Sequence, residues 1–81
     1  MEHGDFKIGQ TFWTETGHWL CTDLGSKVVV ALKLTEDNIR DNPILYTELD
    51  EKVIKKHPFV GEMVFNHYDL GGCWLTPPHS L

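Results

Sequence analysis

Two segments of the chain contain the side-chain types that bind metals or act as nucleophiles. The first segment is Cys21-Thr22-Asp23, and the second runs from His67 to Cys73. Alternate residues of a β-strand point to the same face, so Cys21 and Asp23 would project toward one point. If the second segment packs across that face, thiolate, carboxylate and imidazole groups would meet there, and all three are metal ligands. The hypothesis is a mixed metal site made of Cys21, Asp23, His67 and Cys73.

The same residues have other interpretations. A cysteine–histidine pair forms an activated thiolate, which would make the protein thiol-dependent. Alternatively, both cysteines are buried apolar residues, or they form a disulfide, which a reducing cytosol disfavours. Asp23 and Asp69 would then bond to the backbone of glycine turns beside them. The chain has no CxxC pair, so it lacks the spacing that most strongly indicates a zinc site.

Aromatic residues are the second feature with a chemical consequence. In a chain this small they normally build the core. Here, both faces of the expected strands carry large apolar residues, and only one face can cover a single core. We therefore expect some of these residues to line an exposed groove that binds an extended or proline-rich peptide. The groove candidates are Phe12, Leu20, Tyr68 and Trp74.

Other catalytic patterns are missing from the sequence. It has no glycine-rich phosphate loop, no Ser-His-Asp order and no HExxH, so we assign no catalytic residue and no cofactor. The acidic residues between Glu36 and Glu51 are typical of a solvated face. His57 precedes Pro58 at an expected helix end, where an imidazolium would suit the helix dipole.

Length and charge narrow the class of protein further. Eighty-one residues at 9.3 kDa, of which 41% are hydrophobic and 23% charged, favour one small folded domain. A formal net charge of −5 argues against binding to nucleic acids or anionic membranes. No apolar run is long enough to span a membrane, and residues 1–5 do not resemble the start of a signal peptide. We expect a soluble cytoplasmic protein.

Tight turns predict how the first half of the chain folds. Gly25-Ser26 has the pattern of a two-residue type II′ hairpin loop, which would pair Cys21 with Val30 and Trp19 with Leu32. The alternation then predicts a core face, made of Val28, Val30, Leu32 and Leu34.

A second turn is expected just upstream. A three-residue loop at Glu15-Thr16-Gly17 would place Trp13 opposite Trp19 on the core face and send Phe12 and Leu20 to the other face. Cross-strand tryptophans would be a strong contact.

The second half of the chain is expected to be less regular. Residues 35–43 are predicted to form an exposed connection with room for one helical turn, and residues 48–56 to form one short helix. A strand is expected over residues 62–66, and residues 68–75 contain a Gly-Gly turn that could return as another strand. The ordered core would then cover about residues 6–75, with a loose tail at residues 76–81.

Several of these segments together resemble a known group of proteins. The stretch Trp19-Leu20-Cys21-Thr22-Asp23 and the later Gly72-Cys73 are similar to a Trp-x-Cys-Thr-Asp … Gly-Cys pattern in a family of small uncharacterised bacterial proteins. The resemblance covers about half of the chain and implies no activity. That family usually has an acidic pair where this chain has Asn66-His67, so a shared site there is in doubt.

Together these patterns predict a mostly β fold, either a small curved antiparallel sheet or an SH3-like barrel with one short helix. The alternative is a two-layer α+β arrangement in which the helix covers one sheet face. The expected function is a non-enzymatic binding or accessory module that recognises another protein, as a monomer or homodimer. The alternative function is a metal-binding or thiol-dependent protein that uses Cys21, Asp23, His67 and Cys73.

Overall fold

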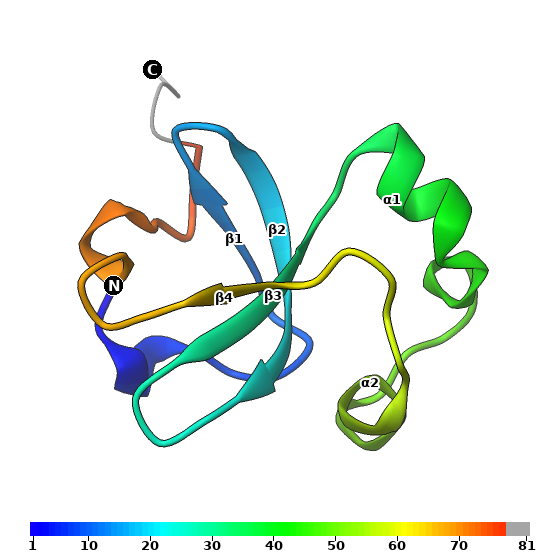
Figure 1. The fold of residues 1–81 in the computed structure, drawn as a ribbon, viewed down its shortest axis with the longest axis horizontal. Coiled ribbons are helices and arrows are strands. Elements are labelled where there is room, and N and C mark those ends of the chain that lie inside the picture. The colour runs from blue at the N-terminus through cyan, green and yellow to red at the C-terminus, as the bar shows by residue number, and fades with distance from the viewer. Residues whose placement is uncertain (78–81) are drawn as a thin grey trace.

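The chain forms one antiparallel sheet with a helical insertion before its last strand (Figure 1). The computed structural model describes residues 1–77. The four strands, each paired with the next along the chain, are β1 (Thr11–Thr14), β2 (Gly17–Leu24), β3 (Val29–Lys33) and β4 (Met63–Phe65). The insertion contains the helices α1 (Glu36–Asp41) and α2 (Glu51–Lys56). Short 3-10 helices cover His3–Asp5, Pro43–Tyr46 and Leu70–Gly72.

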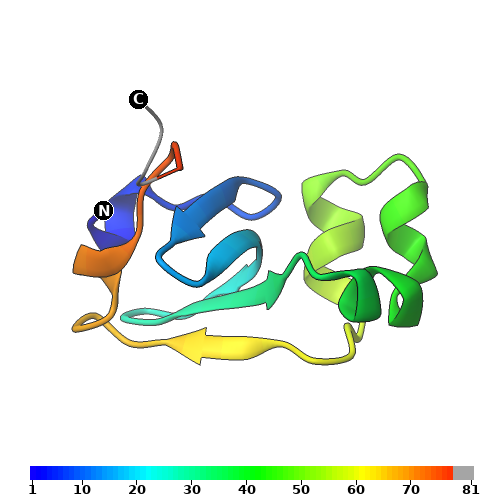
Figure 2. The same ribbon diagram turned by 90° about the horizontal axis from the view of Figure 1, so that it is seen from above.

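The prediction of a small curved antiparallel sheet is confirmed, but the sheet does not close into a barrel. After β4 the chain crosses back to β1, where Trp74 forms one isolated bridge with Trp13. Two α-helices are present instead of one, because the polar connection after β3 forms a full helix capped by Thr35. Both helices lie together at one end of the sheet and do not cover a face in a second layer (Figures 1 and 2).

The first core lies on the face of the sheet where side chains of the two edge strands, β1 and β4, come into contact. We define it by its buried residues, which are Phe6, Phe12, Trp19, Cys21, Val29, Ala31, Leu70 and Cys73. Phe12 stacks on Trp19 with 6.5 Å between ring centroids, and Phe65 meets Trp19 edge-on at 4.9 Å. These contacts join β1, β2 and β4 into one aromatic cluster.

The second core joins the helical insertion to the opposite face of the sheet. Its buried residues are Leu32, Ile54 and Phe59. Asn42, which is also buried, connects the end of α1 to the chain that returns toward β4. Its amide donates to the Asn38 and Val60 carbonyls at 2.7 and 3.0 Å, and its oxygen accepts from the Val60 N–H at 2.8 Å. Both faces of the sheet therefore contribute buried residues, the second face at the end where it meets the helical insertion.

The register of β1 and β2 differs by one residue from the prediction. The loop contains only Glu15 and Thr16, so Trp13 lies opposite His18 and Phe12 lies opposite Trp19. The predicted pairing of Trp13 with Trp19 is therefore wrong. A one-residue slip also changes the face of the sheet on which a side chain lies relative to its neighbours. Trp13 instead stacks on His18, with 4.1 Å between ring centroids.

The register of β2 and β3 also differs from the prediction. The loop covers residues 25–28, where the Gly25 N–H donates to the Val28 carbonyl at 3.0 Å. Next to this loop, Leu24 lies opposite Val29, two residues away from the predicted register. A bulge between Cys21 and Asp23 reduces the displacement to one residue, so Cys21 lies opposite Ala31 and not Val30. As a result Val29 and Ala31, not Val28 and Val30, lie in the first core.

The remaining elements lie close to their predicted places. Strand β4 falls within the expected residues 62–66. The second helix begins at Glu51 and not near residue 48, because the Asp50 carboxylate accepts from the Val53 N–H and caps it there. Residues 70–72 form a 3-10 helix where a returning strand was expected, and only Trp74 pairs with β1. Most of the predicted tail, residues 78–81, lies outside the described residues.

Candidate functional site

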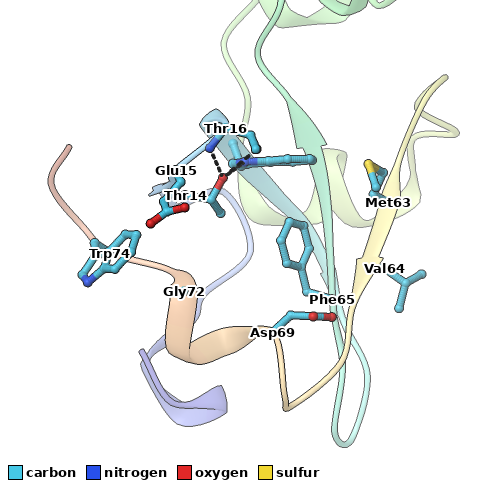
Figure 3. A pocket seen from close by; sticks show the side chains of 10 residues that line it. Thr14, Glu15, Thr16, Met63, Val64, Phe65, Asp69, Gly72 and Trp74 are labelled. Atoms are coloured by element: carbon cyan, nitrogen blue, oxygen red, sulfur yellow. Dashed lines mark hydrogen bonds between the residues drawn. The ribbon is translucent and has the colours of Figure 1, made fainter. Parts of the chain in front are cut away.

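An open groove lies between the β1–β2 turn and the outer edge of β4 (Figure 3). We call it the seam groove, because it occupies the gap across which the sheet does not close. Its volume is about 560 Å³. Its lining residues are Thr14, Glu15, Thr16, Trp19, Met63, Val64, Phe65, Asp69, Gly72 and Trp74.

Two rings of the aromatic cluster, those of Trp19 and Phe65, form the base of the seam groove. The Trp19 ring meets the Phe65 ring edge-on, and its indole N–H donates to the Thr14 hydroxyl at 2.9 Å. The same hydroxyl accepts from the Thr16 N–H at 3.2 Å, so the turn and the indole are fixed together. This part of the groove is therefore rigid and apolar, with its one indole donor already satisfied.

The two sides of the groove expose apolar side chains. On one side Trp74 is 38% exposed, and paired backbone hydrogen bonds with Trp13 of 2.6 and 2.8 Å hold it in place. On the other side, Met63 of β4 is 55% exposed and lies on the same face of the strand as Phe65, whereas Val64, which is 64% exposed, points to the opposite face (Figure 3). β4 is an edge strand that pairs only with β3, so its second edge faces the groove side of the molecule. Apolar residues beside an unpaired strand edge are a known setting for binding another chain.

The charged residues that line the groove are both acidic. Glu15 lies in the β1–β2 turn, and Asp69 lies just before the last 3-10 helix. The Asp69 carboxylate accepts from the Asn66 N–H at 3.1 Å, and the Asp69 N–H donates to the Asn66 carbonyl at 2.9 Å. Lys33 places its amine 5.8 Å from the centre of the Trp19 ring but does not line the groove. The charged side chains of the lining are therefore both negative, and they lie around an apolar base.

Of the four groove residues predicted from the sequence, the structure places only Trp74 in the seam groove. Phe12 is fully buried in the first core, so it cannot line an exposed surface. Leu20 is buried on the opposite side of the sheet, beside a second depression of about 360 Å³. Tyr68 is 82% exposed and packs on His67, outside the groove lining.

Most of the lining residues could not be identified from the sequence, because the groove depends on the curl of the sheet and on the edge position of β4. Trp19 and Phe65 were assigned to strands, but their meeting depends on how strongly the sheet curls. Met63 and Val64 have no distinctive motif. The available signal was their position on the last strand of a meander, which has to lie at a sheet edge.

The predicted metal ligands are not brought together. Cys21 and Cys73 are both buried in the first core, whereas His67 is exposed. The Asp23 carboxylate accepts from the Leu24 N–H at 2.8 Å, next to the β2–β3 turn. In the part of the chain that the structure describes, no group of three or more histidine, cysteine or acidic side chains could hold a metal ion.

Both thiols lie in surroundings that keep them protonated. Burial raises the pKa of Cys21 to about 11, and burial also raises the pKa of Cys73. Each thiol lies near one backbone carbonyl, that of Asp23 for Cys21 at 3.7 Å and that of Asp69 for Cys73 at 3.6 Å. Both are free cysteines. Since the thiolate is the reactive form, this environment does not activate either residue.

The second depression is apolar. Its lining residues are Leu20, Leu34, Ile39, Leu45, Tyr46 and Leu49, between the sheet and the helical insertion. It has no charged side chain and only one hydroxyl in its lining, so it has little means of selecting a ligand.

Comparisons with known proteins do not assign the chain to a family. No family model, curated protein or solved structure matches it significantly. Within residues 1–77, the helices are too short and too polar to cross a membrane.

Proposed function

We propose that this chain is a binding module that holds an extended segment of another protein in the seam groove. The observation that carries the proposal is an apolar groove that runs beside the unpaired edge of β4. An edge strand can hydrogen-bond to an added strand, and neighbouring pockets then select its side chains. The burial of both thiols gives no support to a metal-binding or thiol-dependent function.

The exposed side chains of the groove supply a driving force for this binding. Met63 and Trp74 each keep a third or more of their surface in contact with water. Covering each of them would contribute about 1 kcal/mol from apolar burial. The rigid Trp19 and Phe65 rings lose little conformational entropy on binding, because they already pack on each other.

An unbiased peptide library displayed on phage, selected on the purified protein, tests the proposal. We expect selected peptides to quench or shift tryptophan fluorescence, because Trp19 and Trp74 both line the groove. We expect Met63→Lys and Trp74→Ala each to weaken binding by about tenfold or more. Val60→Lys is the matched control for Met63→Lys, since Val60 is similarly exposed but does not line the groove.

Two results would contradict the proposal. One is a library that yields no peptide sensitive to Met63→Lys or Trp74→Ala. The other is a set of peptides that lose affinity equally with Val60→Lys. Circular dichroism of each variant shows whether the fold is kept, so that a folding defect is not read as a binding defect.

A further inference from the structure

The seam groove has a specific charge pattern, which bears on what kind of segment it takes. Its charged lining residues are Glu15 and Asp69, and no lysine, arginine or histidine lines it. The whole chain has a net charge of −5. Resting on the function proposed above, we propose that the occupant is a basic extended segment with the pattern Arg-x-apolar-x-Arg. One arginine would meet Trp74 and Glu15, and the other would meet Asp69.

The corner formed by Trp74 and Glu15 suits a guanidinium group. The backbone bridge between Trp13 and Trp74 holds the Trp74 backbone beside β1, and the indole lies next to the Glu15 side chain of the following turn (Figure 3). The indole is partly exposed, and Glu15 forms no ion pair among the described residues. A guanidinium can stack on an indole and donate to a carboxylate at the same time, whereas a lysine ammonium has no planar face to stack.

Asp69 provides the second acidic position, next to Phe65 in Figure 3. Its two hydrogen bonds with Asn66 hold the carboxylate in the turn that follows β4. The apolar base formed by Trp19 and Phe65 belongs to the same groove. In an extended segment, residues i, i+2 and i+4 point to one side, so a basic, an apolar and a basic residue could face the groove together.

A second copy of this chain fits the groove less well. Two copies would each bring a charge of −5, and like charges oppose association. The densest basic residues, Lys52, Lys55 and Lys56, lie on helix α2 and not in an extended segment. Charge complementarity therefore favours a different, basic partner.

The test uses the full chain and four capped heptapeptides. The first is Ser-Arg-Ser-Val-Ser-Arg-Ser, and the others replace both arginines by lysine, by neutral citrulline or by glutamate. Affinity is measured by tryptophan fluorescence and by amide chemical shifts at low salt. We expect the arginine peptide to bind best, the citrulline peptide to bind at least fivefold more weakly, and the glutamate peptide to show no binding.

Protein variants locate the charge effect. Glu15→Gln and Asp69→Asn should each weaken binding of the arginine peptide by about two- to fivefold and leave the citrulline peptide unaffected. Asparagine at position 69 keeps an oxygen that can accept from the Asn66 N–H, so the turn is kept. Glu48→Gln is the control, because it removes the same charge from a residue outside the groove.

Different failures would have different meanings. If arginine and citrulline peptides bind equally and Trp74→Ala abolishes both, the basic partner is wrong while the peptide-binding function stands. If the arginine advantage survives Glu15→Gln and Asp69→Asn, the charges act elsewhere and the inference is also wrong. A concentration-dependent dimer disrupted by Met63→Lys would identify a second copy as the occupant and overturn the inference. If neither these peptides nor any library peptide binds, the proposed function itself fails.

Discussion

The rings of Phe12 and Phe65 lie 5.6 Å apart, although the two residues belong to strands at opposite edges of the sheet. In a flat sheet of four strands the edge strands would lie roughly 14 Å apart. The contact therefore requires a strongly curled sheet. It also closes the base of the seam groove, since Phe65 belongs to both the groove lining and the aromatic cluster.

The first prediction concerns this contact. Phe65→Ala should lower the free energy of unfolding by about 2–3 kcal/mol, because it removes ring contacts with both Phe12 and Trp19. Its neighbour Val64 is exposed, so Val64→Ala should change stability by no more than about 0.5 kcal/mol. Urea unfolding followed by circular dichroism measures both. Equal losses of unfolding free energy in the two variants would show that Phe65 does not hold the curled sheet together.

The second prediction concerns Asn42. Asn42→Ala should lower the free energy of unfolding by about 2–3 kcal/mol, because it leaves the part-buried Val60 N–H without its acceptor and removes the donor to two carbonyls. Asn66→Ala is the comparison, since the Asn66 side chain accepts from Tyr68 N–H at an exposed site. We expect that variant to lose less than about 1 kcal/mol in the same unfolding experiment. The reverse order would contradict the assigned role of Asn42.

The third prediction concerns pH and Cys21. Burial raises its pKa in the folded state to about 11 from an ordinary value of 9.0, so the unfolded chain loses this proton first as pH rises. The contribution of the protonated Cys21 thiol to the free energy of unfolding is complete below about pH 9 and is lost as pH rises toward 11. Unfolding free energies measured at pH 8 and pH 10 should fall more steeply for the native chain than for Cys21→Ala. Parallel pH profiles for the two proteins would count against a raised pKa.

The fourth prediction concerns His18. Burial lowers the pKa of His18 below the ordinary 6.5. The contribution of the neutral His18 ring to the free energy of unfolding is therefore present above pH 6.5 and is lost as pH falls through the folded-state pKa. Proton NMR should place the titration midpoint of the His18 ring below 6.5. His18→Gln should remove this part of the acid sensitivity. A midpoint at or above 6.5 would refute the expectation.

The sequence predicted the strands and the mostly β class well, because turns and alternation are local signals. It failed on register, where a single residue decides which face a side chain occupies. The two-residue loop at Glu15-Thr16 and the bulge after Cys21 each moved residues between faces, so Phe12 became a core residue. The groove could not be predicted either. It depends on Phe65 reaching across to Trp19, and such curl comes from packing of distant residues.

The separation of the two cores has a consequence for hydrogen exchange. The second core has only three buried side chains, and the helices that rest on it are six residues long each. The segment between β3 and β4 therefore costs less to open than the sheet beneath it, and its amides should exchange sooner than those of β2 and β3. Since Val60, held by Asn42, leads directly into β4, each such opening frees one wall of the groove. A bound segment that pairs with β4 should slow exchange in α1 and α2, which it does not touch.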